Sequence, residues 1–79
     1  MAEDQSIGGI LALVISKYPI VRELKNIESF YFTFKPDFNT LKNHIRSLRP
    51  TKLGGEFIEV SKSLDYLINE LNRWKKVNQ

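Results

Sequence analysis

Apolar residues recur at helical spacing along the first third of the chain. A run of six of them at positions 10–15 predicts a helix that begins near Asp4 or Ser6 and ends at about Lys17, just before a Tyr-Pro pair. A Gly-Gly pair near the start of this helix weakens it by about 1 kcal/mol per residue relative to alanine, and would also let another element approach closely. A second, shorter helix is predicted over Val21–Glu28, where apolar residues recur every three positions.

The period changes at residues 30–34. Phe30, Phe32 and Phe34 alternate with other side chains, which predicts a strand with one aromatic face. Sheets that expose such aromatic residues stack nucleic-acid bases on them. A domain this small has few other large side chains, however, and each buried phenylalanine contributes about 2–3 kcal/mol. We therefore expect the phenylalanines in the core and Tyr31 outside it.

A third helix is predicted to begin after Asp37, which is a favourable N-cap residue, and to end before Pro50. Its apolar residues follow one another at intervals of three, four and three positions. They are Phe38, Leu41, Ile45 and Leu48. This spacing is typical of an amphipathic helix with one buried face.

The last third of the chain predicts a short strand followed by a long helix. A Gly-Gly turn precedes the apolar segment 57–60, which predicts a second strand. Ser61 or Ser63 is predicted to cap the last helix. The apolar residues of that helix are Leu64, Leu67, Ile68, Leu71 and Trp74.

These elements predict an α+β fold in the order α-α-β-α-β-α, with a two-stranded sheet packed on three or four helices. We expect one domain, residues 1–79, with frayed ends at 1–5 and 77–79. The 42% hydrophobic content is typical of a globular domain, and the absence of cysteine excludes disulfides and thiolate metal sites. The run at 10–15 is too short to span a bilayer and has no basic segment before it, so we expect a soluble, intracellular protein without a membrane partner.

Positive charge is concentrated in the middle of the chain. Residues 35–55 hold five basic residues and one acidic residue, a net charge of +4, whereas the whole chain has +3. On a helix that begins after Asp37, Lys42, Arg46 and Arg49 share one face, because they lie at i, i+4 and i+7. Such a face is the electrostatic footprint of a helix that binds nucleic acid. Another acidic partner, or an ordinary solvated surface, would be compatible with the same pattern.

The pattern leads to two candidate functions. The first is a non-catalytic module that docks the helix over residues 37–49 on DNA or on a nucleic-acid complex. Its candidate contacts are Lys42, Arg46, Arg49 and Lys52, with Asn43 and His44 as polar readers. The alternative is a protein-interaction module or homodimer that uses the last helix. Its candidate residues are Tyr66, Arg73, Trp74, Lys75 and Lys76, although cations in a last helical turn also simply complement the helix dipole.

Patterns that would indicate catalysis or a metal site are missing from the sequence. His44 is the single histidine and there is no cysteine, so a metal site would lack nitrogen and sulfur ligands. No nucleophile with an adjacent base is indicated, and no GK[ST] motif follows the second Gly-Gly pair. We expect no enzyme activity, no cofactor and no small-molecule substrate.

Residues 10–60 resemble the winged-helix DNA-binding domains of response regulators. The matching segments are 10–13, 21–24, 40–49, 52–54 and 57–59. In that family the helix that corresponds to residues 41–49 enters the major groove. The resemblance implies that Lys42, Asn43, Arg46 and Arg49 contact phosphates or bases.

A second resemblance involves some of the same residues. Segments 33–36, 55–58 with Val60, and 73–76 resemble the C-terminal domain of vesiculovirus phosphoproteins. Those domains are not enzymes, and they bind a nucleoprotein–RNA template through basic residues. This resemblance likewise implies a binding module for a complex that contains nucleic acid.

Overall fold

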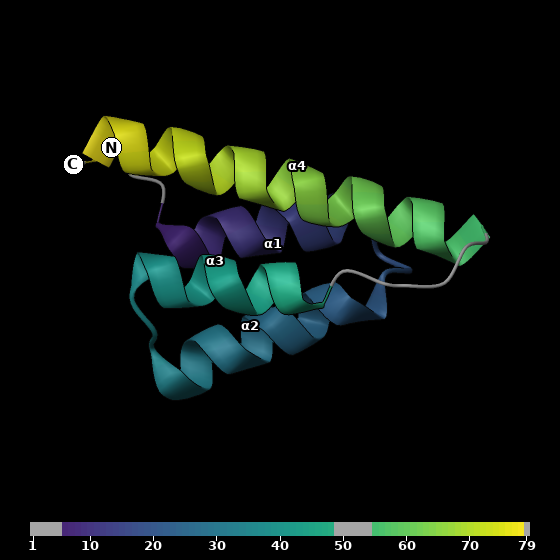
Figure 1. Cartoon of the computed structure of the whole chain (residues 1–79), viewed down its shortest axis with the longest axis horizontal. Coiled ribbons are helices and arrows are strands. Elements are labelled where there is room, and N and C mark those ends of the chain that lie inside the picture. The colour runs from purple at the N-terminus through teal and green to yellow at the C-terminus, as the bar shows by residue number, and fades with distance from the viewer. Residues whose placement is uncertain (1–5, 49–54, 79) are drawn as a thin grey trace.

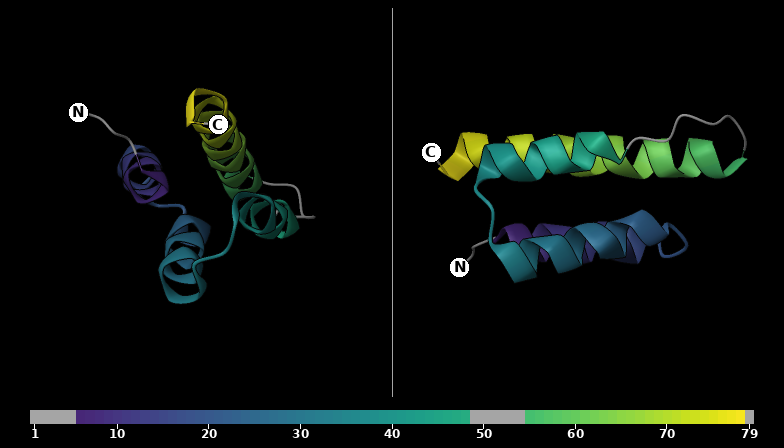
Figure 2. Two further views of the ribbon diagram at one scale, coloured as in Figure 1. Left: turned by 90° about the vertical axis from the view of Figure 1, so that its left-hand side faces the viewer. Right: turned by 60° about the horizontal axis from the view of Figure 1, so that its bottom comes forward.

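The computed structural model describes residues 6–48 and 55–78, and the side chains of 6–48 and 58–78. Four helices make up these segments, namely α1 (Ile7–Lys17), α2 (Arg22–Phe34), α3 (Phe38–Ser47) and α4 (Gly55–Asn78). They run alternately in opposite directions along the long axis, and α4 extends over the whole length of the other three (Figure 1). Seen end-on, the helices surround one common interior (Figure 2).

The starts of α1 and α3 agree with the sequence prediction. Ser6 caps α1, and its Oγ accepts a hydrogen bond from the backbone N–H of Gly9 at 3.0 Å. Asp37 caps α3 in the same way, with Oδ1 accepting from the N–H of Thr40 at 2.8 Å. Each cap satisfies a backbone donor that the first helical turn leaves without a partner.

All four helices contribute aliphatic side chains to the core. Among the most deeply buried are Leu11, Val14, Leu24, Ile27, Leu41, Ile45, Leu64, Leu67 and Leu71. One polar side chain, Ser63, lies among them, and its hydroxyl donates to the carbonyl of Val60 at 2.8 Å. That bond satisfies the hydroxyl inside its own helix, so its burial carries no large desolvation cost.

The predicted α+β fold is wrong, because the described residues contain helices and no strand. Residues 30–34 form the last turns of α2 instead of a strand. Their alternation also fits a helix, since Phe30 and Phe34 lie four positions apart and continue the three- and four-residue intervals of Leu24 and Ile27. The expected burial of the phenylalanines is also wrong for Phe32 and Phe34, which are 55% and 69% exposed, whereas Tyr31 is half-buried.

The second predicted strand is wrong for a similar reason. Residues 57–60 belong to α4, which begins at Gly55, so neither Ser61 nor Ser63 is a cap. Val60 lies four positions before Leu64 and faces the core with it, which extends the helical stripe backwards. Residues 77 and 78 belong to α4, whereas residues 1–5 and 79 lie outside the described part of the chain; the fraying of the ends stays a prediction.

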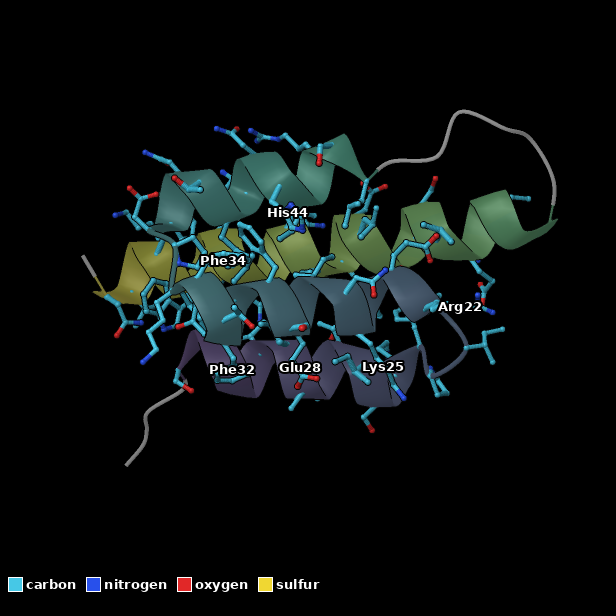
Figure 3. The ribbon with its side chains drawn as sticks, turned by 90° about the horizontal axis from the view of Figure 1, so that it is seen from below. Arg22, Lys25, Glu28, Phe32, Phe34 and His44 are labelled. Carbon is cyan, nitrogen blue, oxygen red and sulfur yellow. The ribbon has the colours of Figure 1, made fainter. Side chains whose placement is uncertain are left out.

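The first Gly-Gly pair does allow close approach at one of its two positions. A Cβ atom on Gly8 would lie 2.9 Å from Cζ of Phe32, so the ring of Phe32 rests against the backbone of α1. A Cβ on Gly9 would meet only Ser6 Oγ, at 3.5 Å. Gly8 therefore serves the contact between α1 and α2, and Figure 3 shows Phe32 between these helices.

Candidate nucleic-acid interface

Helix α3 lies beside the C-terminal half of α4, and a hydrogen bond joins the two helices. Lys42 Nζ donates to Asn72 Oδ1 at 2.8 Å, across 30 positions of sequence. In Figure 2, α3 lies next to α4 in the end-on view and overlaps the C-terminal half of α4 in the side view. This neighbourhood brings together side chains that the sequence assigned to two separate candidate sites.

The ring of Phe38 is the centre of this neighbourhood. Lys42 Nζ and Lys75 Nζ each lie 5.3 Å from its centroid. The ring also stacks on Trp74, with centroids 6.1 Å apart and planes inclined by 22°. We refer to Phe38, Lys42, Asn72, Trp74 and Lys75 as the basic–aromatic cluster.

The electrostatics of the cluster favour an anion. Each ammonium group interacts favourably with the negative face of the ring, by about 0.5–1 kcal/mol at exposed positions. The two positive charges nevertheless repel each other. The hydrogen bond from Lys42 ends on a neutral amide, so that bond leaves its charge uncompensated. A phosphate group at the cluster would reduce the repulsion and interact with both lysines.

The other predicted nucleic-acid contacts on α3 divide between two sides of the helix. Asn43 and Arg46 are exposed, and Arg46 follows Lys42 by one helical turn, as predicted. His44 lies on the flank that faces α2, where its ring stacks on Phe30 with centroids 3.9 Å apart (Figure 3). Arg49 and Lys52 lie outside the described residues.

The candidate interface on the last helix is also divided. Trp74 and Lys75 belong to the basic–aromatic cluster, and Lys76 is exposed beside them in sequence. Arg73 forms a salt bridge with Glu70 at 3.5 Å.

Tyr66 faces α1 instead. Its ring lies against Tyr18, with centroids 6.1 Å apart, and Lys17 Nζ lies 5.3 Å from its centroid. Tyr66 and Trp74 therefore make contacts within the fold and do not form one surface together.

Phe38 and Asn72 were not predicted as members of the site. The hydrophobic pattern assigned Phe38 to the buried stripe, and nothing in the sequence distinguishes Asn72. One signal was present, because Phe38 lies four positions before Lys42, the spacing at which a lysine can reach a ring on its own helix. The partner from α4 could not be found in this way.

Asp37, at the start of α3, is the carboxylate nearest in sequence to the cluster. The N–H of Thr40 holds the pKa of this carboxyl below its ordinary value of 3.8, because the hydrogen bond favours the charged form. The carboxylate of Asp37 therefore serves as the N-cap of α3. Among the described residues, no three His, Cys, Asp or Glu side chains come together as metal ligands would.

No helix in the described segments combines the length and the apolar character that crossing a membrane requires. Comparisons with protein-family models, with curated proteins and with solved structures found no match to this chain. The resemblances to winged-helix domains and to the vesiculovirus phosphoprotein domain stay predictions.

Proposed function

We propose that this protein is a non-catalytic nucleic-acid-binding module that docks through the basic–aromatic cluster and the exposed face of α3. The observation that carries the proposal is the convergence of Lys42 and Lys75 on the single ring of Phe38. These lysines come from different helices, so their proximity is a property of the fold and not of one charged segment.

The arrangement suits a phosphate backbone. Lysines act as point charges toward phosphate, and Arg46 and Lys76 extend the positive surface along α3 and toward the end of α4. Binding would release counterions from the nucleic acid, so the affinity should fall steeply as the salt concentration rises. Contacts of this kind determine affinity and orientation more than sequence preference.

The test is fluorescence anisotropy of labelled duplex DNA and single-stranded RNA, titrated at low and at physiological salt. The variant Arg46→Gln/Lys75→Gln removes two charges at the proposed interface. The matched control, Arg22→Gln/Lys25→Gln, removes two exposed charges from α2, near the start of that helix (Figure 3). We expect the first variant to reduce the log–log salt slope for duplex DNA by about 1.8, or 0.9 per phosphate contact, and the control to leave it unchanged.

Two results would contradict the proposal. The first is that the wild-type chain binds neither nucleic acid at low salt. The second is that both double variants weaken binding equally. The second result would mean that binding depends on net charge alone and not on the cluster.

A further inference from the structure

The end of α2 presents an aromatic ring that is supported on one side and open to solvent. Phe34 is 69% exposed, and its ring rests on Phe30, with centroids 5.3 Å apart and planes inclined by 44°. Phe30 is held in turn by the stacked ring of His44 from α3. Figure 3 shows Phe34 and His44 between α2 and α3, so this ring is supported by two helices.

The residue after Phe34 is a lysine whose backbone has an unusual conformation. Lys35 has φ 48° and ψ 54°, the left-handed region, and is the only non-glycine residue with positive φ in the described part of the chain. Its N–H donates to the carbonyl of Tyr31 at 2.9 Å, which fixes the end of the helix. Glycine is the usual residue at such a position, because a side chain there is strained. An observed strained residue is a reason to look for a functional role, and here the strained residue is an exposed cation that directly follows an exposed ring in the sequence.

We infer that Phe34 and Lys35 bind single-stranded nucleic acid, with an unpaired base stacked on Phe34 and an adjacent phosphate at Lys35. Proteins that bind single strands combine exposed aromatic rings with cations in this way, whereas a duplex keeps the faces of its bases stacked inside. The inference rests on the proposed function and names its ligand class. Phe34 is linked through Phe30 to the side of α3 that faces α2, whereas the basic–aromatic cluster lies where α3 meets α4, so one strand that crosses α3 would contact both.

The experiment compares a labelled oligothymidine of about 16 nucleotides, the upper end of single-strand site sizes, with a duplex of the same length. Phe34→Ala removes the stacking ring. Phe32→Ala is the matched control, because Phe32 is also an exposed phenylalanine of α2 but rests on Gly8 of α1. We expect Phe34→Ala to weaken oligothymidine binding about tenfold, the effect of one lost base–aromatic stack, and to leave duplex binding unchanged. Phe32→Ala should bind both ligands as tightly as the wild-type chain does.

Lys35→Gly provides a second test that does not depend on removal of a packed side chain. Glycine is compatible with the observed backbone, so this variant keeps the fold while it removes the charged side chain. We expect the salt slope for oligothymidine to fall by about 0.7, the value for one phosphate contact of a single strand.

The outcomes separate the inference from the proposed function. If Phe34→Ala and Phe32→Ala bind oligothymidine equally well, while Arg46→Gln/Lys75→Gln still weakens duplex binding, the inference is wrong and the proposed function stands. If the wild-type chain binds neither oligothymidine nor duplex, both are wrong.

Discussion

The imidazole ring of His44 is stacked on the phenyl ring of Phe30, with centroids 3.9 Å apart and planes inclined by 14°. Both side chains are half-buried, and they join the outer part of α2 to α3. The single histidine of the chain is therefore a packing residue between helices. Because Phe34 rests on Phe30, the same stack also determines where the exposed ring of Phe34 lies.

Replacement of His44 by alanine should lower the free energy of unfolding by about 1 kcal/mol, the loss of one stacked aromatic contact. For a chain of this size the melting temperature should fall by about 4–8 °C. Asn43→Ala is the control on the same helix, because Asn43 is exposed, and its effect should stay within about 0.5 kcal/mol. Urea denaturation followed by circular dichroism measures both variants. Equal stabilities would mean that the stack contributes nothing.

The region around Phe30 also shows why the sequence alone did not predict the secondary structure of residues 30–34 correctly. Five alternating residues fit a strand, but the same residues fit the end of a helix, and a short apolar run does not distinguish the two. Tertiary contacts favour the helix at these residues. On opposite flanks of α2, Phe32 packs against Gly8 of α1 and Phe30 stacks on His44 of α3. The first helix starts at Ser6, one of its two predicted positions, and the third starts at Asp37 as predicted, since a cap depends on residues only three positions apart.

The same holds for the candidate site, where contacts within one helix were predictable from the sequence and contacts between two helices were not. Lys42 and Arg46 were predicted on one face of α3 from their spacing, which is a local property of a helix. Lys75 was assigned to a different site, because its approach to Phe38 depends on α3 lying beside α4. The spacing of residues along the sequence does not predict that α3 packs beside α4.

The two glycines of α1 should respond differently to alanine. Gly9→Ala should raise the free energy of unfolding by about 0.5–1 kcal/mol, because alanine favours the helix and its Cβ meets only Ser6 Oγ at 3.5 Å. Gly8→Ala should show little net gain, because its Cβ would lie 2.9 Å from Phe32 and the ring must move.

Chemical denaturation of a double-mutant cycle checks the cause of this difference. In a Phe32→Ala background the obstacle at Gly8 is gone, so Gly8→Ala should then stabilise the chain as much as Gly9→Ala does. If Gly8→Ala is strongly stabilising in the wild-type background, the ring of Phe32 does not rest on the backbone of α1.

The N-cap of α3 should make stability dependent on pH in the acid range. The hydrogen bond from Thr40 lowers the pKa of Asp37 below 3.8 in the folded chain, whereas the unfolded chain keeps the ordinary value. The stabilisation is therefore fully present above the unfolded pKa and is lost as the pH falls through the lower, folded pKa. Asp37→Ala should lower the melting temperature at neutral pH, because Thr40 loses its acceptor.

Asp37→Asn separates the cap from its charge. Asparagine accepts the same hydrogen bond but does not titrate, so its melting temperature should fall less than that of the wild type between about pH 5 and pH 2. Thermal melts across that range measure the difference. Parallel curves for the wild type and Asp37→Asn would show that the carboxylate of Asp37 contributes nothing to the pH dependence.

Lys35 at the end of α2 should be replaceable by glycine with a gain in stability. A non-glycine residue in the left-handed region is strained by about 1–2 kcal/mol, and Lys35 occupies that region with φ 48°. Lys35→Gly should therefore raise the free energy of unfolding by about 1 kcal/mol, whereas Lys35→Ala removes the same charge but keeps the Cβ and the strain. Urea denaturation of the three chains should rank glycine above lysine and alanine. If alanine stabilised the chain as much as glycine, the gain would come from removal of the charge, and the left-handed backbone at Lys35 would not be the cause.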